Sequence, residues 1–220
     1  MNPAFIEHRK VLYYNYKQIF ILKRLQNMRT VNIKAREAKK REIMEKVFDC
    51  YAESGLNNIS MKDIADRSGF NVASVYQYFE DLDDLIIQST EYVMTAVEDD
   101  FMALAPNNIE DLWKFIDEIP YWTAKKHGKK YCLMYQVYTN PKYKKYGQEF
   151  FKGVDQRYTE YARSLESKLN IPYEKITPLI FILIRASVHY ALFADEFYLK
   201  SQLAVLKETL IFFIDKYKRK

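Results

Sequence analysis

Apolar residues recur at steps of three and four along almost the whole chain, which is the period of amphipathic helices. In the first such stretch Ile43, Val47 and Tyr51 share one face. Glycine, proline and asparagine interrupt the pattern and mark the ends of helices. The predicted helices cover residues 35–54, 61–68, 72–79, 82–101, 108–118, 121–127, 129–138, 142–169, 173–196 and 199–218. Ser60, Asn71 and Asp81 are the predicted N-caps of the second, third and fourth of these helices. No stretch has a convincing strand pattern, so an all-α protein is expected.

Composition supports this interpretation. The 220 residues include only five glycines and six prolines, whereas an all-β chain needs a turn signal about every 8–12 residues. Two cysteines, Cys50 and Cys132, are too few for a disulfide framework. The longest apolar runs are too short for a signal peptide or a membrane span. A cytoplasmic protein with reduced thiols and no membrane span is therefore expected.

The net charge of +5 hides four blocks of opposite sign. Residues 1–41 carry +9, residues 42–79 carry −3, residues 80–118 carry −11 and residues 119–220 carry +10. Such blocks suggest that different parts of the chain face different partners. The sequence alone does not explain the acidic block.

Residues 59–85, ISMKDIADRSGFNVASVYQYFEDLDDL, have the spacing of a helix-turn-helix. Such a motif needs a small residue where its helices touch, here Ala65, and a glycine in the left-handed turn four residues later, here Gly69. A β-branched core residue, Val75, follows six residues on. This spacing alone also fits a generic helical hairpin.

The flanking residues sharpen the match. About residues 38–88 resemble the DNA-binding domain of the tetracycline-repressor (TetR) family of bacterial regulators. The resemblance rests on Asp63-Ile64-Ala65, Gly69, Tyr76-x-Tyr78-Phe79 and Leu85. It implies a three-helix DNA-binding domain at residues 34–80 and a helical effector-binding and dimerisation domain at residues 81–220, after an extension at residues 1–33.

By this resemblance, helix 72–79 enters the DNA major groove while the preceding helix crosses the phosphate backbone. The residues expected at phosphates are Ser60, Lys62, Tyr76 and Tyr78, and those expected at bases are Val72, Ala73, Ser74 and Gln77. Glutamine suits a bidentate contact with adenine, and small apolar side chains can meet a thymine methyl group.

The sequence departs from the family pattern directly after the motif. The family commonly has a lysine after the Tyr-Phe pair, whereas residues 80–84 here read Glu-Asp-Leu-Asp-Asp. Val72 also stands where a basic or polar residue is common in the family. Helix 72–79, which is expected to contact the bases and is called the reading helix below, therefore carries no charged side chain. Because affinity for DNA depends largely on phosphate neutralisation, we expect bases upstream to supply it. They are Lys34, Arg36, Lys39, Lys40 and Arg41.

Residues 1–33 lie outside the resemblance and have an aromatic, amphipathic pattern. Three interpretations stay open. The segment forms an added helix that packs on the DNA-binding domain or on a partner chain, or a helix at a membrane surface. Alternatively, the reading frame starts too early and Met28 is the first residue.

In the C-terminal part, the resemblance implies that the last two helices form a four-helix bundle with a second subunit, as a palindromic operator requires. The expected interface residues are Leu183, Tyr190, Phe193, Leu203, Leu206, Leu210 and Phe213. The pocket candidates are Trp113, Trp122, Tyr131, Tyr135, Tyr138, Phe151, Tyr158, Arg185 and His189. Aromatic walls with few polar groups suit an apolar or cationic effector, although each residue could equally belong to the core. Arg185 lies among apolar residues and, if buried, needs an acidic partner from the chain, a second subunit or a ligand.

Enzymatic function is not expected. His8, His127 and His189 lack zinc-type spacing, and the chain has no phosphate-binding glycine loop or nucleophile elbow. No metal or cofactor is predicted. We therefore expect a homodimeric transcriptional regulator that binds double-stranded DNA, acting as a repressor released from its operator by an unknown small-molecule effector. The alternative is a DNA-binding architectural protein of the same fold that senses no effector.

Overall fold

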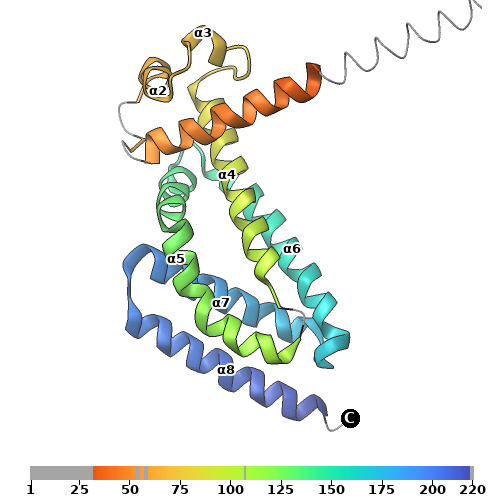
Figure 1. Cartoon of the computed structure of the whole chain (residues 1–220). Helices are drawn as coiled ribbons and strands as arrows, with labels where there is room; N and C mark the ends of the chain where they lie inside the picture. Colours follow the sequence, from red (N-terminus) through yellow and green to blue (C-terminus); the bar gives the residue numbers. More distant parts are fainter. Residues whose placement is uncertain (1–31, 53–54, 57–58, 107, 219–220) are drawn as a thin grey trace, which may run out of the picture. The chain divides into compact units, whose positions relative to one another are not determined.

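The computed structural model describes residues 32–52, 55–56, 59–106 and 108–218, and all its regular elements are helices (Figure 1). The chain divides into two units, residues 1–43 and residues 44–220. A first helix covers residues 32–52. The later helices are α2 (Met61–Ser68), α3 (Val72–Val75), α4 (Leu82–Leu104), α5 (Ile109–Thr139), α6 (Lys144–Leu169), α7 (Tyr173–Phe193) and α8 (Glu196–Lys218). The prediction of an all-α fold is confirmed.

Three predicted helix starts are confirmed by their caps. The side chains of Ser60, Asn71 and Asp81 each accept a hydrogen bond from a backbone N–H in the first turn of the helix that follows. Gly69 ends α2 with φ 73°, a left-handed conformation that glycine adopts without steric cost. Local sequence is therefore sufficient to set the boundaries of α2 and the starts of α3 and α4.

The division of residues 108–138 into three helices is wrong, because α5 is one continuous helix of 31 residues. Pro120 is buried within it and removes only one backbone hydrogen bond. Gly128 does not break the helix either. A Cβ atom at Gly128 would lie 3.4 Å from the carbonyl oxygen of Ala191 in α7. This distance is an ordinary van der Waals contact, so α5 and α7 lie close together here without requiring a glycine.

Several other boundaries differ from those predicted. The predicted helix 72–79 is a four-residue helix, α3, followed by a turn in which Phe79 N–H donates to the Val75 carbonyl oxygen at 3.2 Å. Helix α7 ends at Phe193, and Ala194 takes a left-handed conformation with φ 52°. Helix α8 starts at Glu196, three residues earlier than predicted.

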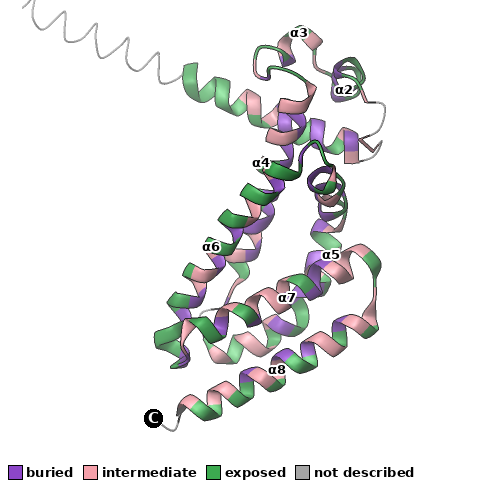
Figure 2. Ribbon diagram, turned by 180° about the vertical axis from the view of Figure 1, so that it is seen from behind, coloured by how far each residue is buried: buried purple, intermediate pink, exposed green. Residues whose placement is uncertain are grey.

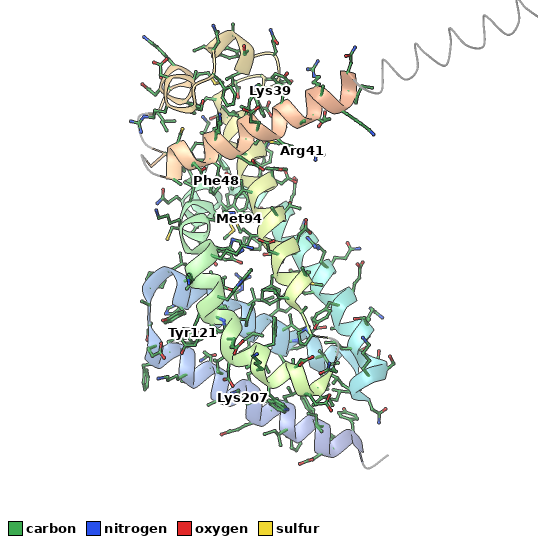
Figure 3. The ribbon with its side chains drawn as sticks, viewed as in Figure 1. Lys39, Arg41, Phe48, Met94, Tyr121 and Lys207 are labelled. Carbon is green, nitrogen blue, oxygen red and sulfur yellow. The ribbon has the colours of Figure 1, made fainter. Side chains whose placement is uncertain are left out.

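Helix α7 lies at the centre of the C-terminal half, where it packs chiefly against α5 and also against α6 and α8. Buried residues line the facing sides of these helices (Figure 2). Tyr121 of α5 points toward α8 and donates a hydrogen bond to Glu196 at 2.8 Å (Figure 3). Among the described helices, only α7 has the length and mean hydropathy, 1.7, of a membrane span. Helix α7 contacts three neighbouring helices, but only 33% of its most apolar stretch is buried within the chain.

The acidic block at residues 80–118 is paired with the basic block that follows it. Four ion pairs join α4 and the first part of α5 to later segments: Asp83–Lys142, Asp99–Arg157, Asp100–Lys126 and Asp117–Lys207. Exposed pairs contribute at most about 1 kcal/mol each. These ion pairs therefore help to fix how the helices lie against each other rather than adding much stability. The acidic block at residues 80–118 and the basic block at residues 119–220 thus pair with each other within the chain.

His127 is buried in α5 with 1% of its surface exposed, and its ring packs edge-to-face on Trp122 at 5.1 Å. Burial lowers the pKa of His127 to about 4, and the positive charge of Lys130 acts in the same direction. The nearby carboxylate of Asp100, 3.3 Å from His127 Nε2, opposes the shift without reversing it. The imidazole is therefore neutral at physiological pH.

We expect this histidine to destabilise the protein in mild acid. Between pH 6.5 and about 4 the unfolded chain binds a proton at His127 that the folded chain does not, so the free energy of unfolding falls as pH falls. Once His127 is protonated in both the folded and the unfolded chain, the total decrease in the free energy of unfolding is about 3 kcal/mol. Urea unfolding at pH 7, 6, 5 and 4.5 should show a shallower decline for His127→Leu than for the wild type. Parallel curves would contradict this assignment.

Candidate nucleic-acid interface and interior site

Helices α2 and α3 meet through the residues that the motif spacing singled out. Ala65 and Val75 are completely buried, as is Ile64, and Phe79 closes the same core. Gly69 makes the left-handed turn between the two helices. The helix-turn-helix geometry is thus confirmed, with α3 as its second helix.

The residues predicted to read DNA lie together on α3 and the turn that follows it. Ala73, Tyr76 and Gln77 are exposed, with Tyr76 at 52%, whereas Val72, Ser74 and Tyr78 are half-buried. None of these residues carries a formal charge. The surface therefore offers hydroxyl, amide and methyl groups, which suit base edges and phosphate oxygens.

Asn71 belongs to the same surface and was missed by sequence reasoning. It is exposed, and its Oδ1 accepts a hydrogen bond from the N–H of Ala73 at 2.8 Å. An amide side chain at the start of a reading helix lies close to the bases in this type of complex. Its identification as an N-cap was the signal that could have found it.

The start of α2 differs from what a phosphate site requires. Asp63 accepts hydrogen bonds from both the N–H of Ser60, at 2.9 Å, and its hydroxyl, at 2.5 Å. These hydrogen bonds lower the pKa of Asp63, so a carboxylate occupies the N-terminus of the helix. Because the hydroxyl of Ser60 already donates its hydrogen to Asp63, it is not free to donate to a phosphate. Among the predicted phosphate contacts of this segment, the exposed Lys62 is the better candidate.

The upstream bases belong to the helix at residues 32–52. Lys34, Arg36 and Arg41 are exposed and Lys40 is half-buried, while Lys39 pairs with Glu42 at 2.9 Å. Residues 1–31 lie outside the described residues. The interpretations of the segment 1–33, including Met28 as the first residue, therefore stay predictions.

The acids that replace the family lysine have local roles. Asp81 caps α4, and Asp84 accepts a hydrogen bond from the N–H of Glu80 at 3.0 Å. Asp83 accepts hydrogen bonds from Lys142 Nζ and from the hydroxyl of Tyr143, both at 2.6 Å. Burial alone would raise the pKa of Asp83, but these two hydrogen bonds outweigh it and the pKa is lowered. The first turn of α4 is thus fastened to the corner between α5 and α6.

Six of the nine predicted pocket residues are linked to one another in the C-terminal half. Tyr158 of α6 donates a short hydrogen bond to Glu98 of α4, and burial raises the pKa of Glu98. Arg185 of α7 lies 3.4 Å from the hydroxyl of Tyr135 and 5.4 Å from the ring of Phe151. The linked residues are Tyr131, Tyr135, Tyr138, Phe151, Tyr158 and Arg185.

Two expectations about this interior need correction. Arg185 is exposed rather than buried, so it needs no buried acidic partner. Glu98 was missed, although it falls between Met94 and Phe101 on the inward face of α4 and is 6% exposed. A charged residue at an inward helical position was the available signal.

The other three pocket candidates have different surroundings. Trp113 and Trp122 pack against the apolar core that contains Tyr158, and Trp122 also packs on His127. His189 lies near the end of α7, where Nε2 is 3.5 Å from Asp195 and the ring is 4.2 Å from that of Tyr198. The two tryptophans therefore border the same core as Tyr158, whereas His189 contacts the connection between α7 and α8.

The predicted interface residues also divide into two groups. Leu183, Leu203, Leu206 and Leu210 are buried inside the chain itself, so they are not available to a second subunit. Tyr190 and Phe213 are half-buried, and only Phe193 is exposed. The large apolar side chains exposed on the last two helices and their connection are Phe193, Phe197, Val205, Ile211 and Phe212.

Comparison with known proteins agrees with this geometry. Residues 43–88 match the family model of bacterial regulatory proteins of the tetR family. No curated protein matches the chain in sequence. A TetR transcription regulator from Haloarcula marismortui superposes with a TM-score of 0.63 at 18% identity, over 80% of this chain and 98% of that one.

Two further solved structures share the fold. The fatty acid degradation regulator FadR from Bacillus halodurans has a TM-score of 0.53 at 17% identity, over 80% of this chain and 94% of its own. A TetR family transcription regulator from Marinobacter aquaeolei has a TM-score of 0.50 at 16% identity, over 80% of this chain and 97% of its own. Residues 43–88, with the predicted helix-turn-helix core, therefore match the DNA-binding domain of tetR-family regulatory proteins, and the chain as a whole shares the fold of the solved regulators.

Proposed function

We propose that this regulator is a cytoplasmic homodimer that represses transcription from a palindromic operator and is released by a small-molecule effector. The observation that carries the proposal is the exposed reading surface at residues 71–78, held on the buried core of α2 and α3. The proposed DNA-binding domain covers residues 34–80, and the effector-binding and dimerisation domain covers residues 81–220. No catalytic role is proposed.

The exposed side chains of α7 and α8 support dimerisation. Phe197 is 85% exposed and Phe212 is 59% exposed, and large aromatic side chains of this kind are often covered by a partner. Only 33% of the most apolar stretch of α7 is buried within the chain. A two-fold dimer through this surface would present two α3 segments to two half-sites.

The interior around Glu98 supports an effector site. It combines a buried carboxylate with several tyrosines and adjoins a hollow between α4 and α6. Asp83 fastens the start of α4, directly after the reading segment, to the corner between α5 and α6. A ligand that shifts α4 or α6 would therefore also shift the support of α3.

A genome-wide map of bound DNA, combined with transcript levels after deletion of the gene, tests this function. A repressor should occupy a few palindromic sites, and transcripts beside them should rise on deletion. An architectural protein of the same fold would instead occupy many unrelated sites with little change in transcription. A fall in the neighbouring transcripts would identify an activator.

The upstream bases should supply non-specific affinity. Replacing Lys34, Arg36 and Arg41 by glutamine is expected to weaken binding to operator and to random DNA by the same factor. It should also reduce the slope of log affinity against log salt by about 0.9 for each lost phosphate contact. Fluorescence anisotropy from 50 to 200 mM salt measures both quantities. An unchanged slope would show that these bases do not contact DNA.

A further inference from the structure

A groove of about 410 Å³ runs between α4 and α6, which lie side by side in Figure 1. This α4–α6 groove has the size of a site for a drug-sized molecule. Its lining residues are Ile87, Glu91, Thr95, Glu98, Tyr138, Tyr146, Glu149, Phe150, Gly153, Val154, Gln156, Arg157 and Glu160.

The groove carries an excess of negative charge. Four glutamates line it, and the single basic residue among the lining side chains is Arg157. Arg157 is engaged with Asp99, which lies outside the groove, at a distance of 2.7 Å. The positive charge is thus already balanced, and an occupant of the groove faces a negative potential.

Glu98 is the buried member of this set. Its carboxylate accepts a hydrogen bond from the hydroxyl of Tyr158, but none of the described lysines or arginines forms an ion pair with it. A carboxylate removed from water without an opposite charge is costly, and burial raises its pKa accordingly. The positive charges of Arg157 and Arg185 offset this cost only in part, because the pKa of Glu98 is still raised, and a cation bound in the groove would offset more of it.

Aromatic side chains form the wall next to these acids. The rings of Tyr138 and Phe150 lie 5.5 Å apart, and both line the groove. Aromatic faces attract cations, especially where water is excluded. Lys145 already lies over the ring of Tyr146 at 4.7 Å, so Tyr138 and Phe150 are the rings available to a ligand.

We propose that the α4–α6 groove binds an organic cation with an apolar body, with its charge near Glu98 and its body against Tyr138 and Phe150. This proposal rests on the proposed function, because the cation would be the effector. Tyr138 is packed against the first turns of α6, where a Cβ atom at Gly147 would lie 2.7 Å from the Tyr138 side chain. An occupant that contacts Tyr138 would therefore lie next to the end of α5, where the corner held by Asp83 begins.

Isothermal titration calorimetry of the full chain with two nearly isosteric ions tests the proposal. Tetraphenylphosphonium should bind and tetraphenylborate should not. Glu98→Gln should weaken phosphonium binding at least tenfold. Glu166→Gln, an exposed position on α6 outside the groove, is the matched control and should stay within twofold of the wild type.

A second variant guards against a folding defect at position 98. Glu91 and Glu160 are exposed at the rim, so the double change to glutamine leaves the core intact and should weaken phosphonium binding severalfold. Absence of phosphonium binding, equal binding of the borate, or unchanged affinity in both variants would overturn the proposal.

The same phosphonium, added to the protein–operator complex, separates the two proposals. Loss of DNA binding in the wild type but not in Glu98→Gln would support both. Phosphonium binding that depends on Glu98 and leaves DNA affinity unchanged would support the cation site and contradict its role as the effector site.

Discussion

Replacing Ala73 with glutamate is expected to lower the affinity for operator DNA about a hundredfold without lowering thermal stability. Ala73 is exposed near the start of α3, and its backbone N–H donates a hydrogen bond to the capping side chain of Asn71. A carboxylate there would face phosphates and base edges, while an acid in the first turn of a helix is favourable for folding. Loss of a base contact costs about 1–3 kcal/mol, and repulsion adds to it.

Ala103→Glu is the matched control for this change. Ala103 is also an exposed alanine in a helix, but it lies at the far end of α4 from the reading segment. Fluorescence anisotropy with labelled operator should show wild-type affinity for this variant. Equal affinities of the Ala73→Glu and Ala103→Glu proteins would show that α3 does not face DNA.

Phe212→Glu is expected to convert the proposed dimer into a folded monomer and to lower operator affinity more than a hundredfold. Phe212 is an exposed ring of α8 beside Phe213, at 5.7 Å. The change places a charge among the exposed apolar side chains of α8 and leaves the buried leucines of this helix in place. A monomer reads one half-site at a time, so it loses the gain of 10²–10⁴ that linked binding provides.

Sedimentation equilibrium and circular dichroism measure the two parts of this result. Glu208→Gln, at another exposed position of α8, should remain dimeric. A wild-type protein that sediments as a monomer, or a Phe212→Glu protein that stays dimeric, would place the interface elsewhere.

The sequence was most informative where structure is determined locally. Ala65, Gly69 and Val75 are set by contacts within about ten residues, and all three take the predicted roles. Ser60 and Asn71 behave as the predicted caps for the same reason. Helix caps and the left-handed turn at Gly69 depend only on neighbouring residues, so they can be predicted from a short stretch of sequence.

Features set by tertiary packing were less accessible. Gly128 reads as a helix break, but it lies inside the continuous helix α5, which packs against α7. The leucines Leu203, Leu206 and Leu210 form an apolar stripe, and periodicity does not say whether a stripe faces its own chain or a partner. The ion pairs of the acidic block join segments tens of residues apart and likewise leave no local pattern.

The central claim is that residues 71–78 read DNA as a two-fold pair. Selection of binding sites from random double-stranded DNA by the full-length protein tests it most directly. The recovered sites should share an inverted repeat with half-site centres about 10 base pairs, or a multiple of this, apart. Ala73→Glu should recover no such motif. Failure of the wild type to enrich any sequence, or enrichment of a single asymmetric site, would contradict the account.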